Sequence, residues 1–176
     1  HRAAGTGTGD RPAMSPLRAP GLPMLLAVLM VYLLTLVPLP GLLVHAKPFW
    51  LGMAVIWLAL ERPGRGTLGM AFALGLGADL LLGTGFGEHA FRLVVMAFIV
   101  HRFRARLRFF PIWQQTAAVA ALLLNDRVVM LMLRSFSVPV SPDLLFWLPA
   151  LSGALIWPLL VVALDDLRQR LRRRPE

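Results

Sequence analysis

The sequence lacks cysteine and holds few charged residues, which account for only 15% of its 176 positions. Without cysteine, the chain can form no disulfide, no thiolate nucleophile and no Cys-ligated metal site. Hydrophobic residues make up 57% of the chain, and this composition is typical of a membrane protein rather than of a soluble domain. A chain of this length has room for one all-α bundle of about six membrane-spanning helices.

The sequence motifs of common hydrolases and nucleotide-binding proteins are also missing. The sequence contains no H-E-x-x-H helix for zinc, no G-x-S-x-G nucleophile elbow and no P-loop. Asp79 is the one carboxylate in its apolar segment, and Asp165 and Asp166 are adjacent, so their side chains diverge. The sequence therefore predicts no enzyme, no metal site and no cofactor.

Lysine is nearly absent, so the net charge of +9 rests on seventeen arginines. They lie in short runs between apolar segments, which favours a role in membrane topology over nucleic-acid binding. The run Arg102, Arg104, Arg106 and Arg108 is typical of a topology determinant that also contacts anionic lipids. The alternative is that this run docks cytoplasmic proteins.

Six apolar segments are separated by turn residues and predict six membrane-spanning helices. Their expected bounds are 24–37, 48–60, 67–82, 88–100, 113–133 and 146–164, and the second is expected to reach back through 42–44. Residues 1–21 are expected to be a flexible N-terminus, with Met14 a candidate start. Residues 22–167 are expected to form the transmembrane domain, and 168–176 a basic tail.

The arginines also predict the orientation of the bundle. With six spans, the 62–65 turn, the 102–108 run and the 168–174 tail all fall on the same side of the membrane. Loops rich in arginine stay in the cytoplasm, so both termini are expected to be cytoplasmic in a multi-pass protein of the inner membrane.

The chain is organised around residues 69–87, which read GMAFALGLGADLLLGTGFG. Small residues spaced by four let two membrane helices approach closely. A carboxylate among them, Asp79, costs about 2.5–3.5 kcal/mol on insertion scales unless it is paired. We expect its partner to be Arg92 on the next segment, with His89 as the alternative. Asn125 and Asp126 form a possible second polar site in the same outer half of the membrane.

Two interpretations of these polar groups stay open at this point. They could be ion pairs that fix helix packing, or they could shape a groove for a partner helix or a small ligand. The candidate groove residues are Gly69, Ala73, Gly75, Gly77, Asp79, Gly83, Gly87 and Arg92.

Several motifs in one order give the chain a family resemblance. They are Pro48-Phe49-Trp50 with Trp57 and Pro63, the Asp79-x3-Gly83-x3-Gly87 run, Ala90-Phe91, Trp113-Gln114-Gln115 and Trp157-Pro158. In this pattern the chain resembles the MreD rod shape-determining proteins over residues 21–170. It departs from the family at His89, where an arginine is expected, and carries an arginine at position 92 instead.

The resemblance implies a bundle similar to the substrate-binding components of energy-coupling-factor transporters, without catalysis. It also implies a scaffold that binds MreC and works with MreB, a SEDS-family glycosyltransferase and a class B penicillin-binding protein in lateral peptidoglycan synthesis. The alternative function is a small-ligand-binding membrane subunit of a transporter.

Overall fold

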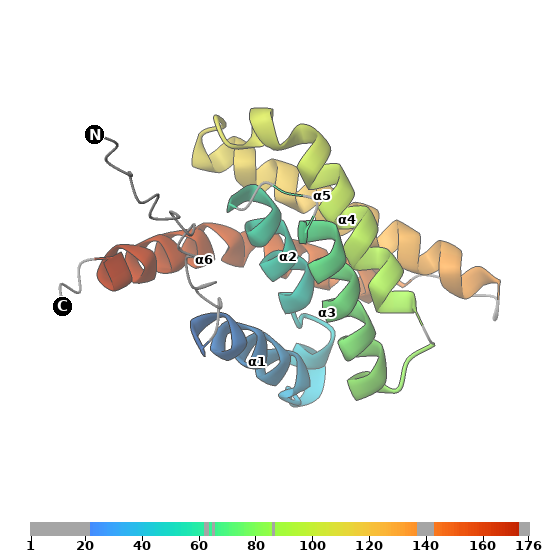
Figure 1. The fold of residues 1–176 in the computed structure, drawn as a ribbon. Helices are drawn as coiled ribbons and strands as arrows, with labels where there is room; N and C mark the ends of the chain where they lie inside the picture. The colour runs from blue at the N-terminus through green and yellow to red at the C-terminus, as the bar shows by residue number, and fades with distance from the viewer. Residues whose placement is uncertain (1–21, 62–63, 65, 86, 137–142, 173–176) are drawn as a thin grey trace, which may run out of the picture.

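The computed structural model describes residues 22–61, 64, 66–85, 87–136 and 143–172, and within these ranges the chain is helical with no strand (Figure 1). The expectations for residues 1–21 and for the end of the basic tail concern residues outside these ranges. The elements in order are α1 (Leu22–Leu36), the 3-10 turn η1 (Gly41–Val44), α2 (Trp50–Glu61), α3 (Gly66–Leu82), α4 (Glu88–Leu107), α5 (Ile112–Ser135), the 3-10 turn η2 (Leu144–Trp147) and α6 (Leu148–Arg172).

The six helices agree with the six predicted segments, and the differences lie at their ends. The fourth segment was expected to end near Val100, but α4 continues to Leu107 because arginine is a good helix former. Similarly, α6 passes the expected end at Leu164. The predicted extension of α2 back through 42–44 is wrong, since Pro48 lacks the N–H that would continue a helix through it.

Two stretches of the described chain are long and apolar enough to cross a membrane. They are Ile112–Ser135 and Leu144–Asp166. The second consists of η2 and the greater part of α6. Three further apolar helices are shorter, at Leu26–Leu36, Trp50–Glu61 and Gly66–Leu82. By length and composition alone, the described residues therefore establish two candidate spans.

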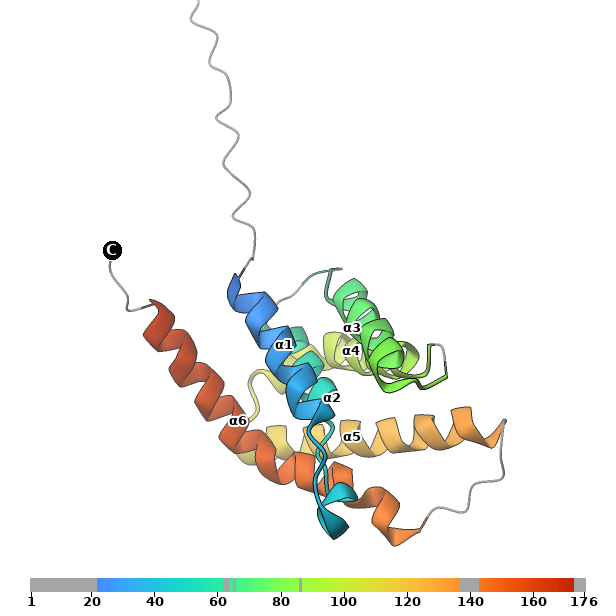
Figure 2. The ribbon, with the colours of Figure 1, turned by 90° about the horizontal axis from the view of Figure 1, so that it is seen from below.

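The helices pack in a sequence of neighbours that places α4 at the centre. α3 runs along α4, which also contacts α2 and α5, while α5 packs on α6 and α1 on α2. In Figure 1, α5 and α6 pass behind α2, α3 and α4, and Figure 2 shows the C-terminal part of α6 projecting beyond the other helices. A buried side chain of α4 therefore contacts α2, α3 or α5, depending on its position around the helix axis.

Two apolar clusters form the core, and α2 and α4 contribute to both. The larger one surrounds the fully buried Trp157 of α6 with side chains of α2, α4 and α5. The smaller one joins α2, α3 and α4 through Leu51, Ala71 and Leu93. At Gly75, a Cβ atom would lie 2.2 Å from the Cα of Ala90, so the two backbones touch only because glycine has no side chain.

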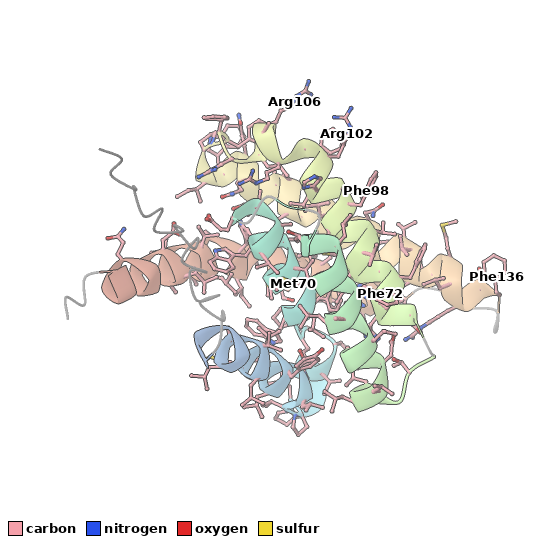
Figure 3. The ribbon with its side chains drawn as sticks, viewed as in Figure 1. Met70, Phe72, Phe98, Arg102, Arg106 and Phe136 are labelled. Carbon is pink, nitrogen blue, oxygen red and sulfur yellow. The ribbon has the colours of Figure 1, made fainter. Side chains whose placement is uncertain are left out.

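Large apolar side chains cover the outside of the bundle, while several charged residues lie inside it. On α6, Leu151, Leu155 and Leu159 are exposed on one face, and Figure 3 shows Phe72 of α3 and Phe98 of α4 directed outward. Soluble monomers rarely expose so much contiguous apolar surface. This inverted distribution is the one expected of helices surrounded by lipid or by partner helices.

Candidate functional site

Asp79 is the centre of a buried polar cluster at the turn from α3 into α4. The residue is 3% exposed. Its Oδ2 accepts a hydrogen bond from the backbone N–H of Gly87 at 2.9 Å, and its Oδ1 accepts one from the N–H of His89 at 2.9 Å. A longer bond of 3.4 Å comes from the N–H of Ala90. Because the first N–H groups of a helix have no partner within it, the carboxylate of α3 caps α4.

Two side chains complete the Asp79 cluster. His89 Nδ1 lies 2.8 Å from Asp79 Oδ1, and the Thr84 hydroxyl donates to the same oxygen at 2.9 Å. An ionised carboxylate only accepts hydrogen bonds, so His89 must present its Nδ1–H. The sequence prediction gave His89 as the alternative partner of Asp79, and this alternative is correct.

Arg92 faces a different helix and forms a second buried pair, with Asp126 of α5. Its Nε lies 2.8 Å from Asp126 Oδ1 and its Nη2 lies 2.5 Å from Oδ2, which is a two-pronged arrangement. Both residues are 3% exposed. The predicted pair of Asp79 with Arg92 is wrong. Residue 92 follows His89 by three positions, so its side chain is turned by about 60° around the α4 axis and lies almost one turn further along it, where it reaches Asp126 of α5.

Three further residues extend this second pair, and the sequence analysis did not identify them as partners. Glu88 Oε1 lies 3.7 Å from Arg92 Nη1 and 3.2 Å from Nη2 of Arg134 on α5. The Arg92 guanidinium lies over the ring of Phe49, 4.8 Å from its centroid. The spacing of Glu88 and Arg92, four residues apart on one helix, was the available signal for the first of these contacts.

The small residues of α3 face three different directions. Ala71 and Gly75 contact other helices in the core, and Gly77 faces Tyr32 of α1, whose hydroxyl would lie 2.5 Å from an added Cβ. Gly69 and Ala73 are exposed, and an added Cβ on Gly69 would meet nothing within 4 Å. Among the small residues of α3, the pair at a spacing of four that is left open for another helix is thus Gly69 and Ala73.

The two remaining glycines of the predicted groove belong to the turn between α3 and α4. Gly83 has φ +63° and Gly87 has φ +93°, a left-handed conformation that glycine adopts most readily. Gly87 occupies the N-cap of α4, and this conformation directs its N–H toward Asp79. Both glycines therefore shape the turn that closes over the carboxylate.

Asn125 and Asp126 lie side by side in sequence but serve different surroundings. Asp126 faces α4, whereas Asn125 lines a cavity of about 420 Å³ between α4 and α5. Mostly apolar side chains line this cavity, among them Ile99 and Phe103, with Arg106 at one side. The structure therefore separates the two residues that we predicted as one polar site.

The arginine run lies on the last turns of α4. Arg104 Nε donates to the carbonyl of Leu60 at 2.7 Å and so ties the end of α4 to the end of α2. Arg102, Arg106 and Arg108 are exposed, and Figure 3 shows the first two pointing away from the bundle. The described residues contain no group of three acidic or histidine side chains that could hold a metal ion.

Comparisons with known proteins agree on one family. Residues 19–165 match the family model described as rod shape-determining protein MreD. The chain is also 27% identical over 144 residues to the rod shape-determining protein MreD of Haemophilus influenzae, an alignment that covers 80% of this chain and 87% of the relative. No solved structure matches the chain.

Proposed function

Because this chain belongs to the MreD family of rod shape-determining proteins, we propose that it is a non-enzymatic scaffold that binds MreC in the inner membrane. The observation that carries this proposal is that its buried charged groups form pairs between neighbouring helices. Asp79 pairs with His89, and Arg92 pairs with Asp126. The first pair joins α3 to α4 and the second joins α4 to α5, and buried pairs of this kind hold membrane helices together.

The proposed topology has six spans with both termini in the cytoplasm. The apolar exterior and the two long apolar helices support a membrane location. The exposed arginines at the end of α4 support a cytoplasmic position for that end. From there they could reach MreB, while the opposite end would face the outer surface of the membrane. The proposed machinery also includes a SEDS-family glycosyltransferase and a class B penicillin-binding protein.

We assign the docking of MreC's transmembrane helix to the Gly69–Ala73 face of α3. Two residues without bulk at a spacing of four allow close backbone approach of a second helix. Phe72 and Leu80 of the same helix are 50% and 70% exposed and flank this face with apolar surface. The Asp79 cluster lies beyond the face and fixes α3 against α4, so its role in the proposal is to hold the docking helix rigid.

The alternative, a small-ligand-binding transporter subunit, requires polar groups that face a cavity. Asp79, His89, Arg92 and Asp126 are buried between helices, and none of them lines the cavity between α4 and α5. The polar lining of that cavity is limited to Asn125 and Arg106, and the four buried groups therefore support the scaffold rather than the ligand binder.

The test is copurification of tagged protein with MreC from native membranes. Gly69→Leu with Ala73→Leu fills the proposed face without meeting the chain's own atoms at Gly69, and we expect MreC recovery to fall at least tenfold. Ala105→Leu, a similar change at an exposed alanine of α4 whose neighbours four residues away are not small, is the control and should leave recovery unchanged. Asp79→Asn should also weaken recovery while the protein still inserts. Full recovery by the double variant would refute the assignment of this face.

A further inference from the structure

The cavity between α4 and α5 is an apolar groove on the outside of the bundle, with a volume of about 420 Å³. Its lining residues come from both helices and from the turn that joins them, and they are Ile99, Phe103, Arg106, Leu107, Phe110, Ala118, Ala121, Leu122 and Asn125. Three of them, Phe103, Phe110 and Ala121, are exposed. The groove is therefore open toward whatever surrounds the bundle.

The side chains of the two walls differ in size, which limits what can enter the groove. On α5 the lining includes two alanines, Ala118 and Ala121, whereas α4 and the turn contribute the phenyl rings of Phe103 and Phe110. A second helix is about 10 Å across with its side chains, and the two rings keep its backbone away from the alanines. A single hydrocarbon chain is much thinner and can lie between the rings and the alanines. The shape of the groove therefore favours an acyl chain over a partner helix.

Arg106 brings a positive charge to one end of the groove. Ile99 lies at the other end, about 10 Å away along α4. Within the part of the chain that the structure describes, the guanidinium of Arg106 takes part in no ion pair and no hydrogen bond. Its side chain is exposed and points away from the bundle (Figure 3). The aliphatic part of the side chain therefore borders the groove, while the charge lies outside it.

Arg102 adds a second charge beside the first. It lies four residues before Arg106, so the two Cβ atoms are about 6 Å apart on one face of α4. Arg102 is also exposed, points away from the bundle and has no carboxylate partner among the described residues. A molecule that fits this surface needs a long apolar chain and an anionic group at one end of it.

We infer that this groove binds an acyl chain of an anionic phospholipid, whose phosphate pairs with Arg106 and Arg102. The inference rests on the proposed membrane location of the helices. A guanidinium can donate two parallel hydrogen bonds to a phosphate. The charges also select among lipids. Phosphatidylglycerol carries a net negative charge, whereas the amine of phosphatidylethanolamine or phosphatidylcholine offsets the charge of the phosphate and weakens its attraction to the arginines.

The test uses the full chain, purified in detergent, stripped of lipid and offered these three lipids with identical acyl chains in native mass spectrometry. We expect phosphatidylglycerol to be retained preferentially. Arg106→Gln should lower its retention about fivefold, the typical effect of one arginine on an anionic lipid. Arg108→Gln is the matched control. It removes the same charge two residues further on, about 200° around the helix axis, where Arg108 lines a separate cavity beside α6.

A second variant tests the groove without changing its charge. Ala121→Phe fills the groove with a large side chain and should lower the retention of all three lipids. Its control is Ala117→Phe, because Ala117 is an exposed alanine of the same helix that does not line the groove. All four substitutions change exposed residues, so they leave the buried core of the bundle intact.

Three results would overturn the proposal. Equal retention of the three lipids would show that the headgroup is not selected. Equal losses in Arg106→Gln and Arg108→Gln would indicate a general attraction to the arginine run. Equal retention by Ala121→Phe and Ala117→Phe would show that no chain occupies the groove. Each of these results is independent of the scaffold proposal, because recovery of MreC is tested at the Gly69–Ala73 face of α3.

Discussion

Replacing Asp79 by alanine should loosen the hairpin of α3 and α4 more than any single change at the surface. In the native chain the carboxylate accepts from the N–H groups of Gly87 and His89, from the Thr84 hydroxyl and from the His89 ring. The variant removes the acceptor from all four donors, of which the N–H and the ring of His89 are buried and those of Thr84 and Gly87 are partly buried. The perturbation is thus a loss of hydrogen bonds, with little change in packed volume.

The magnitude follows from typical values for such groups. A buried donor deprived of its partner costs about 1–3 kcal/mol, and removing one member of a buried ion pair costs about 3–5 kcal/mol. The donors at Asp79 act as one unit, so their costs do not add. We expect a loss of about 3–5 kcal/mol, which corresponds to roughly 6–20 °C in the melting temperature of a chain of this size. Asp79→Asn keeps one acceptor oxygen and should lose about half as much.

The assay is thermal unfolding of the purified protein in detergent, followed by circular dichroism of its helices. Asp143→Ala is the matched control, because Asp143 also accepts a backbone N–H, that of Leu144 at 2.7 Å, but does so in an exposed position. Its loss should be about 1 kcal/mol or less. A melting temperature of Asp79→Ala equal to that of Asp143→Ala would refute the capping role assigned to Asp79.

Three further predictions concern the same helices, each measured by thermal unfolding or by the yield of monodisperse protein. Arg92→Met and Asp126→Leu should each lower the free energy of unfolding by about 3–5 kcal/mol, whereas the double variant should recover most of this loss. Additive losses would show that the two residues do not act as a pair. Gly75→Val should abolish the yield of folded protein, because the Cβ of the new side chain would meet the backbone of α4. Gly69→Val should be tolerated, because a Cβ there would have no neighbouring atom within 4 Å. Equal yields of the two variants would contradict the close contact of α3 and α4. Glu88→Gln should cost less than about 1 kcal/mol, because its partner Arg134 is 45% exposed at the side chain; a loss as large as that of Asp79→Ala would mean that Glu88 is essential to the network.

Much of the fold could be predicted from local patterns. The start of α4 at Glu88 follows from the glycine-rich turn before it, and the end of α3 at Leu82 follows from the end of its apolar run. The far end of α4 was missed because arginines stop an apolar run without stopping a helix. For the candidate site, the burial of Asp79 and Arg92 could be predicted from the cost of placing a charge in lipid, which requires a partner.

The sequence by itself determined that this protein is helical, apolar on its outside and in need of internal partners for a few charges. Composition and spacing are properties of the chain alone, and they set helix length and the cost of burying each charge. Only the tertiary structure decided which groups pair. Hydrogen bonds reach about 3 Å, so the outcome depends on how the Gly83–Gly87 turn rotates α4 against α3. That rotation brings His89 and the first N–H groups of α4 to Asp79 and turns Arg92 toward Asp126 on α5.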